Sequence, residues 1–239
     1  MRHFRKIETD MNCYNCNKPL SKKENHEEHI PAKNLFKTYP AEYKKNLLKV
    51  PSCFKCNNDA SVIDQEIRDA IGIQYDGDIL QKEMSEKALK SIFRNQNWKE
   101  RIFVDEYGRK FKFSFKLNDL IKLHIKNFKG LFYDKYGHTL PERFEIRVIA
   151  EGDENNSDLQ FGASFINLFL DDYPKWEIVG HEDIFKYKFK SLVNDNRIFS
   201  DNNDISNSIG FFCKMVYHNK LKPLVVALDI NRIDEMQNK

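Results

Sequence analysis

Four of the five cysteines fall into two C-x-x-C pairs, Cys13 with Cys16 and Cys53 with Cys56. A C-x-x-C pair on a tight turn presents two thiolates to one side, and two such pairs supply the four sulfurs of a tetrahedral Zn²⁺ shell. Because four sulfurs leave no open position for a substrate, we expect this zinc to be structural. Disulfide bonds are the alternative, but the polar, lysine-rich surroundings and the absence of a signal peptide favour reduced thiols in a cytoplasmic protein.

Chemically active residue types also lie inside and just after the 36-residue segment that separates the two pairs. Glu28 and His29 are followed by Ile-Pro, Asn46 is followed by Leu, and Asn57 comes directly after the last cysteine of the second pair. This combination resembles the HNH endonuclease family, in the zinc-bearing branch whose two C-x-x-C pairs bracket a ββα-metal site. The resemblance covers about residues 13–70 and implies two strands, a connecting loop and a helix that begins near Asn57.

The resemblance also implies a role for each of these residues. Glu28 and Asn57 would be the ligands of a catalytic Mg²⁺ or Mn²⁺, His29 would be the general base, and Asn46 would fasten the loop that holds the histidine. Two positions depart from the family pattern, since Ala60 stands where many relatives carry a lysine and the acidic ligand is Glu rather than the commoner Asp. We expect the first departure to weaken a phosphate contact and the second to lengthen the reach to the metal.

The residue types suit the hydrolysis of a phosphodiester bond, which needs a deprotonated water in line with the leaving oxygen. A neutral imidazole with a pKa near the working pH accepts that proton, and a hard divalent cation held by carboxylate and amide oxygens stabilises the developing charge. Glu27 is an alternative to Glu28, because simple strand alternation would place Glu27 on the same side as His29. The family pattern favours Glu28, since the strand is expected to end there.

The net charge of +3 is unevenly distributed along the chain. Residues 82–129 contain 13 Lys and Arg against 6 Asp and Glu, whereas residues 151–205 contain 5 against 12. The first segment is a candidate surface for the phosphates of a nucleic acid, and a solvated lysine-rich face is the alternative. Closer to the site, Lys55 and Arg68 are candidates for contacts with backbone phosphates, although a surface salt bridge is the other expectation for Arg68.

Apolar residues recur at helical spacing from Asn57 to Gly72, and again within residues 78–96 and 118–136. Alternating segments at 102–104 and 111–115 predict a hairpin. Four later segments predict an antiparallel sheet: residues 144–149, 185–189, 210–217 and 223–228. We therefore expect an α+β protein, with the zinc-stapled HNH module in residues 1–75 and an α+β domain for target or partner recognition in residues 76–239.

The composition is that of an ordinary soluble chain, with 41% hydrophobic and 31% charged residues, and no apolar run approaches the length of a membrane span. No glycine-rich phosphate loop is present, which argues against a nucleotide-binding fold of that kind. His124 falls on the apolar stripe of its helix and is expected to be a hydrogen-bonded core histidine. Cys213 is expected to be a buried free thiol on a strand.

Taken together, these features predict a metal-dependent endonuclease that hydrolyses DNA and, as the resemblance implies, leaves 5′-phosphate and 3′-hydroxyl ends. Segments 130–133, 140–141 and 176–180 are similar to the tail of stand-alone bacterial HNH proteins from mobile and defence islands, which implies restriction or antiviral defence, with a partner protein as a further possibility. One alternative is a zinc-ribbon module that binds nucleic acid or a partner without cleavage. Another is an HNH nuclease directed at RNA.

Overall fold

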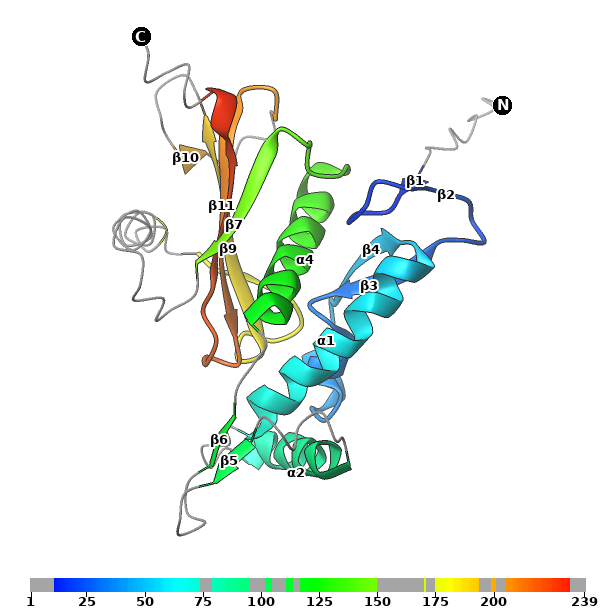
Figure 1. Cartoon of the computed structure of the whole chain (residues 1–239), viewed down its shortest axis with the longest axis vertical. Helices are drawn as coiled ribbons and strands as arrows, with labels where there is room; N and C mark the ends of the chain where they lie inside the picture. The colour runs from blue at the N-terminus through cyan, green and yellow to red at the C-terminus, as the bar shows by residue number, and fades with distance from the viewer. Residues whose placement is uncertain are drawn as a thin grey trace.

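The computed structural model describes residues 11–73, 79–94, 102–104, 111–113, 117–149, 170, 175–193, 199–200 and 205–232 (Figure 1). The leading strand or arm expected at Met1–Asp10 and the connector expected at residues 75–78 lie outside these residues. The elements follow in the order β1 (Met11–Asn12), β2 (Pro19–Leu20), β3 (His26–Ile30), the 3₁₀ helices η1 (Lys33–Phe36) and η2 (Ala41–Lys44), β4 (Leu48–Ser52), α1 (Phe54–Ile73), α2 (Ile79–Arg94), β5 (Ile102–Val104), β6 (Phe111–Phe113), α4 (Leu117–Tyr136), β7 (Phe144–Ile149), β8 (Glu177–Ile178), β9 (Phe185–Val193), β10 (Phe199–Ser200), β11 (Ser208–Tyr217) and β12 (Leu224–Asp229).

The N-terminal part contains two small antiparallel strand pairs and a long helix. β1 pairs with β2, and β3 pairs with β4 in a register that sets His29 opposite Lys49. α1 follows β4 after a single residue. Ala60, Ile67 and Ile71 are buried at helical spacing, so this face of α1 packs inward while the opposite face meets solvent.

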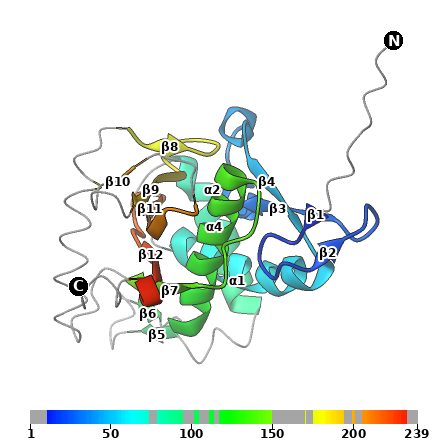
Figure 2. The ribbon, with the colours of Figure 1, turned by 90° about the horizontal axis from the view of Figure 1, so that it is seen from above.

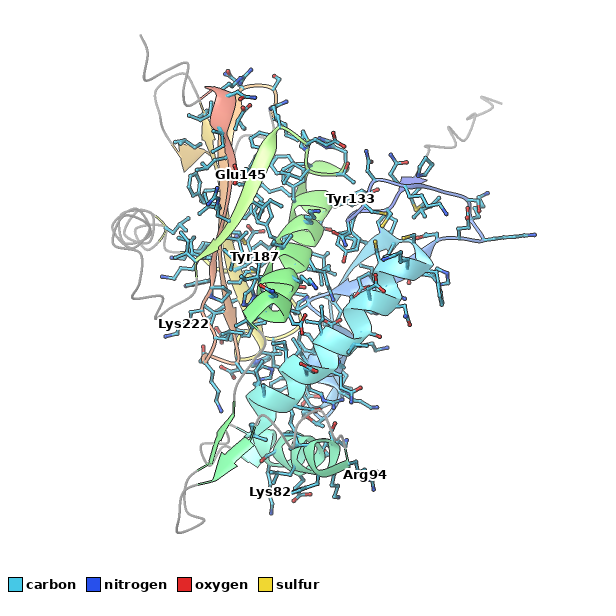
Figure 3. The ribbon with its side chains drawn as sticks, in the orientation of Figure 1. Lys82, Arg94, Tyr133, Glu145, Tyr187 and Lys222 are labelled. Atoms are coloured by element: carbon cyan, nitrogen blue, oxygen red, sulfur yellow. The ribbon has the colours of Figure 1, made fainter. Side chains whose placement is uncertain are left out.

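The C-terminal part is an antiparallel sheet with α4 against one face. The strand order is β10-β9-β11-β12-β7, and β8 also pairs with β9, at Lys186 and Tyr187, on the same edge as β10. In both ribbon views α4 lies between this sheet and the N-terminal elements α1, β3 and β4 (Figures 1 and 2). Side chains fill the layer between α4 and the sheet (Figure 3), where Phe128 stacks on Phe189 and Phe132 meets Phe211 edge to face.

One hydrophobic core joins the two parts. A single cluster of buried side chains includes Ile30 of β3, Phe132 of α4 and Phe211 of β11. Gly130 explains how closely α4 approaches β3, because a Cβ at this position would lie 2.4 Å from the Ile30 Cγ1. Any larger residue here would force the Ile30 side chain or the backbones to shift, so glycine allows this close approach.

The expected fold class is confirmed as α+β with antiparallel sheets. The three predicted helices and the predicted hairpin are present. α4 ends at Tyr136, and the next residue, Gly137, has a φ of +76°, the left-handed conformation that closes a helix. The core crosses the boundary expected at residue 75. The division into two domains therefore stays a prediction.

Candidate functional site

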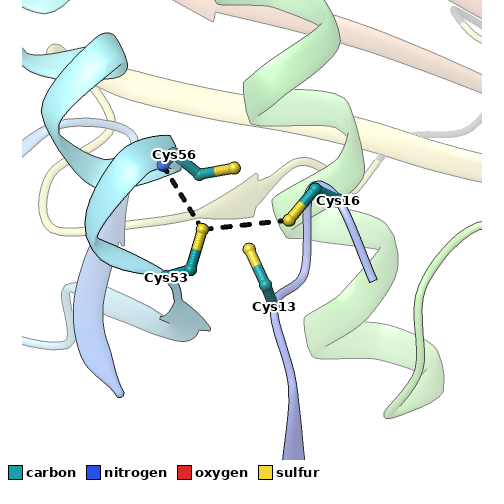
Figure 4. Close-up of side chains that lie close together, drawn as sticks. All are labelled: Cys13, Cys16, Cys53 and Cys56. Carbon is teal, nitrogen blue, oxygen red and sulfur yellow. Dashed lines mark hydrogen bonds between the residues drawn. The ribbon is translucent and has the colours of Figure 1, made fainter. Parts of the chain in front are cut away.

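The four cysteines of the two C-x-x-C pairs converge on one point (Figure 4). Their sulfurs all lie within 4.8 Å of one another, and the Cys16 and Cys53 sulfurs are 3.8 Å apart. A tetrahedral zinc with Zn–S bonds of about 2.3 Å requires sulfurs about 3.8 Å apart, and a disulfide requires about 2 Å. The four residues are free thiols whose geometry fits a metal ion such as zinc, as predicted.

Two short backbone motifs orient these thiols toward one another. Cys13 begins the turn between β1 and β2, where Asn17 adopts a φ of +60° and donates its N–H to the Cys13 carbonyl. Cys53 immediately precedes α1, and the Cys56 N–H donates to the Cys53 sulfur at 3.4 Å. Burial would raise the pKa of Cys13, but neighbouring N–H groups outweigh it and lower this pKa to about 7, which favours the metal-binding thiolate.

Lys129 of α4 hydrogen-bonds to the turn that carries Cys13 and Cys16. Its ammonium donates to the Asn15 carbonyl oxygen at 3.1 Å and to the Asn15 Oδ1 at 3.3 Å. The side chain is part-buried, and burial lowers the pKa of Lys129 while nearby Cys56, Cys16 and Cys13 oppose that shift. Four thiolates around a Zn²⁺ would carry a net charge of −2, so this ammonium is well placed to offset it.

Glu28 points into the protein and already has a cationic partner. It is 5% exposed, and its Oε1 accepts a hydrogen bond from the Lys126 ammonium of α4 at 3.1 Å. Asp64 of α1 binds the same ammonium through both carboxylate oxygens, at 2.6 and 2.8 Å. Burial raises the pKa of Glu28, and Lys126 opposes that rise.

His29 lies on the other side of β3. Its electrostatic neighbours are Lys33, Lys49 and Glu27, and burial together with the two lysines lowers its pKa. The ring is therefore neutral near pH 7, and its Nδ1 is buried with no hydrogen-bond partner among the described residues. The expectation that the strand ends at Glu28 and His29 is wrong, because β3 continues to Ile30 and keeps its alternation.

The two asparagines occupy different local settings. Asn46 is exposed in the loop before β4 with a φ of +55°, a conformation that asparagine tolerates better than most residues. Asn57 is half-buried in the first turn of α1, where its N–H donates to the Cys53 carbonyl at 3.0 Å. This end of the helix carries the positive pole of its dipole. The roles predicted for both residues stay predictions.

The two basic candidates near the site also have partners within the protein. Lys55 is largely exposed and pairs with Asp59 one turn along α1, at 2.6 Å. Arg68 is paired with the buried Asp69, which also accepts a hydrogen bond from Ser91 of α2 at 2.6 Å. Arg68 therefore belongs to the contact between two helices rather than to an open surface.

Sequence reasoning missed the partners that reach the site from α4 and from farther along α1. Asp64 follows Asn57 by two helical turns, so helical periodicity places both on one face of α1 and was a usable signal. Lys126 gave no such signal, because its contact with Glu28 joins residues 98 positions apart. Lys126 also lines a cavity of about 610 Å³ between α1 and α4, together with Asn15, Lys55, Asn58 and Lys122.

His124 differs from its prediction in one respect. It is a core residue that is 1% exposed, and its ring packs against the ring of Tyr217 with 5.7 Å between the two ring centroids. However, neither ring nitrogen has a hydrogen-bond partner among the described residues, so the expected hydrogen bond is absent there. Cys213 is a fully buried free thiol on β11, as predicted.

Comparison of the chain with protein-family models, curated proteins and solved structures found no significant match. Within the described ranges, each helix is too short or too polar to cross a bilayer.

Proposed function

We propose that this chain is a metal-dependent endonuclease that hydrolyses phosphodiester bonds in DNA. The observation that carries the proposal is the junction of β3, β4 and α1 at the four-cysteine cluster. His29 is a neutral, half-exposed imidazole on β3, and α1 begins one residue after β4, the strand that pairs with β3. A neutral imidazole suits the activation of water, and the positive end of a helix suits a phosphate. The proposal rests on this geometry together with the resemblance of the motifs to HNH endonucleases.

In this reaction His29 accepts the proton of the attacking water. Glu28 and Asn57 would hold a Mg²⁺ or Mn²⁺ ion, which stabilises the negative charge that develops on the phosphate and the leaving oxygen. A zinc ion held by the four cysteines would keep β1, β2 and the start of α1 in place. Asn46 shapes the loop that leads into β4, and thereby the strand opposite His29.

Contacts with the DNA backbone would come from the first turn of α1. Lys55 is 83% exposed beside Asn57, and its pairing with Asp59 joins two exposed groups. Exposed pairs of this kind are weak because water screens both charges, so a phosphate can replace the carboxylate at little cost. A role for Arg68 in phosphate binding has less support, because Arg68 already pairs with a buried carboxylate.

The second candidate function is a zinc-ribbon module that binds nucleic acid or a partner protein without cleavage. One observation favours it: Glu28 faces Lys126 and Asp64, on the opposite side of β3 from His29. An RNA-directed nuclease is chemically equivalent at this site. A role in bacterial defence has support from the motif resemblance alone.

The test is nicking of a supercoiled plasmid by the zinc-loaded protein, with and without Mg²⁺ or Mn²⁺. We expect cleavage that requires the divalent ion and falls by at least about 100-fold in His29→Ala. His138→Ala, at an exposed histidine outside the site, is the matched control and should retain parental activity. Binding of DNA without cleavage by the parent would favour the zinc-ribbon function, and cleavage of an RNA of the same sequence alone would favour the RNA nuclease.

A further inference from the structure

The buried cluster of Glu28, Asp64 and Lys126 carries unbalanced charge. The three residues are 5%, 5% and 6% exposed, and they come from β3, α1 and α4. When both carboxylates are ionised, one ammonium faces two negative charges, which leaves a net charge of −1 in the interior. Buried charges are costly unless they are fully compensated, and a divalent cation between the same carboxylates would compensate both.

Two buried oxygens of this part of the protein have no hydrogen-bond partner among the described residues. The Glu28 Oε2 is buried and accepts no hydrogen bond from any described residue, and neither does the hydroxyl of Tyr14, a residue that is 1% exposed. Burial raises the pKa of Tyr14, and the charges of Glu28 and Asp64 add to that rise. Carboxylate oxygens are donors that Mg²⁺ and Mn²⁺ prefer, and oxygens of two carboxylates meet here at one ammonium.

We propose that Glu28 and Asp64 form a divalent-cation site in which the Lys126 ammonium takes the place of the cation when no metal is bound. Binding of Mg²⁺ or Mn²⁺ displaces the ammonium and releases Glu28 from its contact with α4. The inference adds Asp64 as a metal ligand and Lys126 as the competing cation. It rests on the proposed function in one respect, the role of Glu28 as a ligand of the divalent ion.

The surroundings give the displaced side chain a place to go. Lys126 lines the cavity of about 610 Å³ between α1 and α4, whereas Glu28 and Asp64 are not among its lining residues. The Lys126 side chain therefore contacts both carboxylates and also borders this space. Rotation of the Lys126 side chain into the cavity opens the carboxylates to a cation, and Mg²⁺–oxygen distances of about 2.1 Å need only a small inward shift of the carboxylates from their present N···O distances of 2.6–3.1 Å.

Titration of Mn²⁺ into the zinc-loaded full chain, followed by electron paramagnetic resonance, tests the exchange without any cleavage. Lys126→Met removes the competitor, so we expect it to bind one Mn²⁺ at least about tenfold more tightly than the parent. Lys122→Met is the matched control, because Lys122 lines the same cavity from the same helix and pairs with Asp119 instead. The double variant Asp64→Asn with Lys126→Met should lose the increase in Mn²⁺ affinity that Lys126→Met alone produces. Equal Mn²⁺ affinity in Lys126→Met and the parent would overturn the inference.

A second measurement uses the unmodified protein, in case Lys126→Met fails to fold. Acetylation of lysines with a water-soluble reagent, read by mass spectrometry, should find Lys126 protected in metal-free protein and several-fold more reactive as Mn²⁺ is added. The exposed Lys55 should react equally in both conditions. Protection of Lys126 that persists to the highest Mn²⁺ concentration would overturn the inference. Loss of plasmid cleavage with the Mn²⁺ effect intact would count against the nuclease function alone.

Discussion

Lys122, Lys126 and Lys129 lie within two turns of α4 and have three different environments. Lys122 is 67% exposed, Lys126 is enclosed by two carboxylates, and Lys129 is bound to the first cysteine turn. All three contribute to the positive charge of residues 82–129 that suggested a nucleic-acid surface. Because Lys126 and Lys129 already bind groups within the protein, fewer positive charges on this helix are available to phosphates than the composition indicates.

Two buried histidines should make the fold sensitive to acid. Burial lowers the pKa of His124 to about 3, and burial with the nearby Lys220 lowers that of His218 to about 3. In the unfolded chain a histidine takes up a proton near pH 6.5, so the unfolded state binds more protons below that pH and stability falls from pH 6.5 downward. Each histidine should lower the free energy of unfolding by about 2 kcal/mol between pH 7.5 and pH 5.

The variant His124→Phe isolates one of these contributions. Phenylalanine keeps the packing against Tyr217 and removes the titrating ring. In urea unfolding at pH 7.5 and pH 5, the free energy of unfolding should fall by about 2 kcal/mol less in this variant than in the parent. His138→Phe, at an exposed position, should behave as the parent does. An unchanged acid loss in His124→Phe would show that its ring already titrates normally in the folded protein.

At the scale of elements, α4 acts as the bridge between the sheet and the zinc-binding turn. Lys129 hydrogen-bonds the Asn15 backbone, and Thr139 just beyond the helix donates to the Asn17 side chain at 3.0 Å. Both acceptors lie in or next to the turn that carries Cys13 and Cys16. The retention of zinc should therefore depend on a helix that contributes no ligand to it.

Lys129→Met tests this dependence. Without the ammonium, the thiolate cluster loses a compensating charge and the turn loses two hydrogen bonds, so zinc should pass to a colorimetric chelator about tenfold faster than from the parent. Lys122→Met, on the same helix but away from the turn, should leave the rate unchanged. Equal rates in Lys129→Met and the parent would mean that the cysteine turn holds its geometry without α4.

The elements that the sequence predicted are those with a long pattern. α1, α2 and α4 each repeat their apolar positions over four or more turns, and the strands of the large sheet have several alternating or continuous apolar residues. The two-residue strands β8 and β10 have no such pattern. They form because their backbones pair with the edge of β9. The cysteine cluster was predictable from spacing, whereas the Glu28 cluster depends on how α4 packs against β3, which no local spacing encodes.

At the scale of the whole molecule, the continuous core argues against independent folding of the two parts. Tyr14 and Ile30 from the first part belong to the same cluster as Phe128, Phe211 and Tyr217 from the second. If residues 1–75 formed a separate unit, its buried apolar surface would have to be covered without α4. We therefore expect the full chain to unfold in one cooperative transition.

Two probes, one at the cysteine cluster and one beside the large sheet, can check this expectation. Co²⁺ in place of zinc gives a thiolate absorption that reports the cysteine cluster, and in a Trp98→Phe variant the fluorescence comes from Trp176 alone, beside Lys188 of β9. Guanidinium titrations followed by the two signals should give the same midpoint and the same slope, because loss of either part exposes the core of the other. A cobalt signal that disappears at a lower denaturant concentration, while the Trp176 signal stays native, would instead support the domain boundary at residue 75 and would place α4 with the sheet.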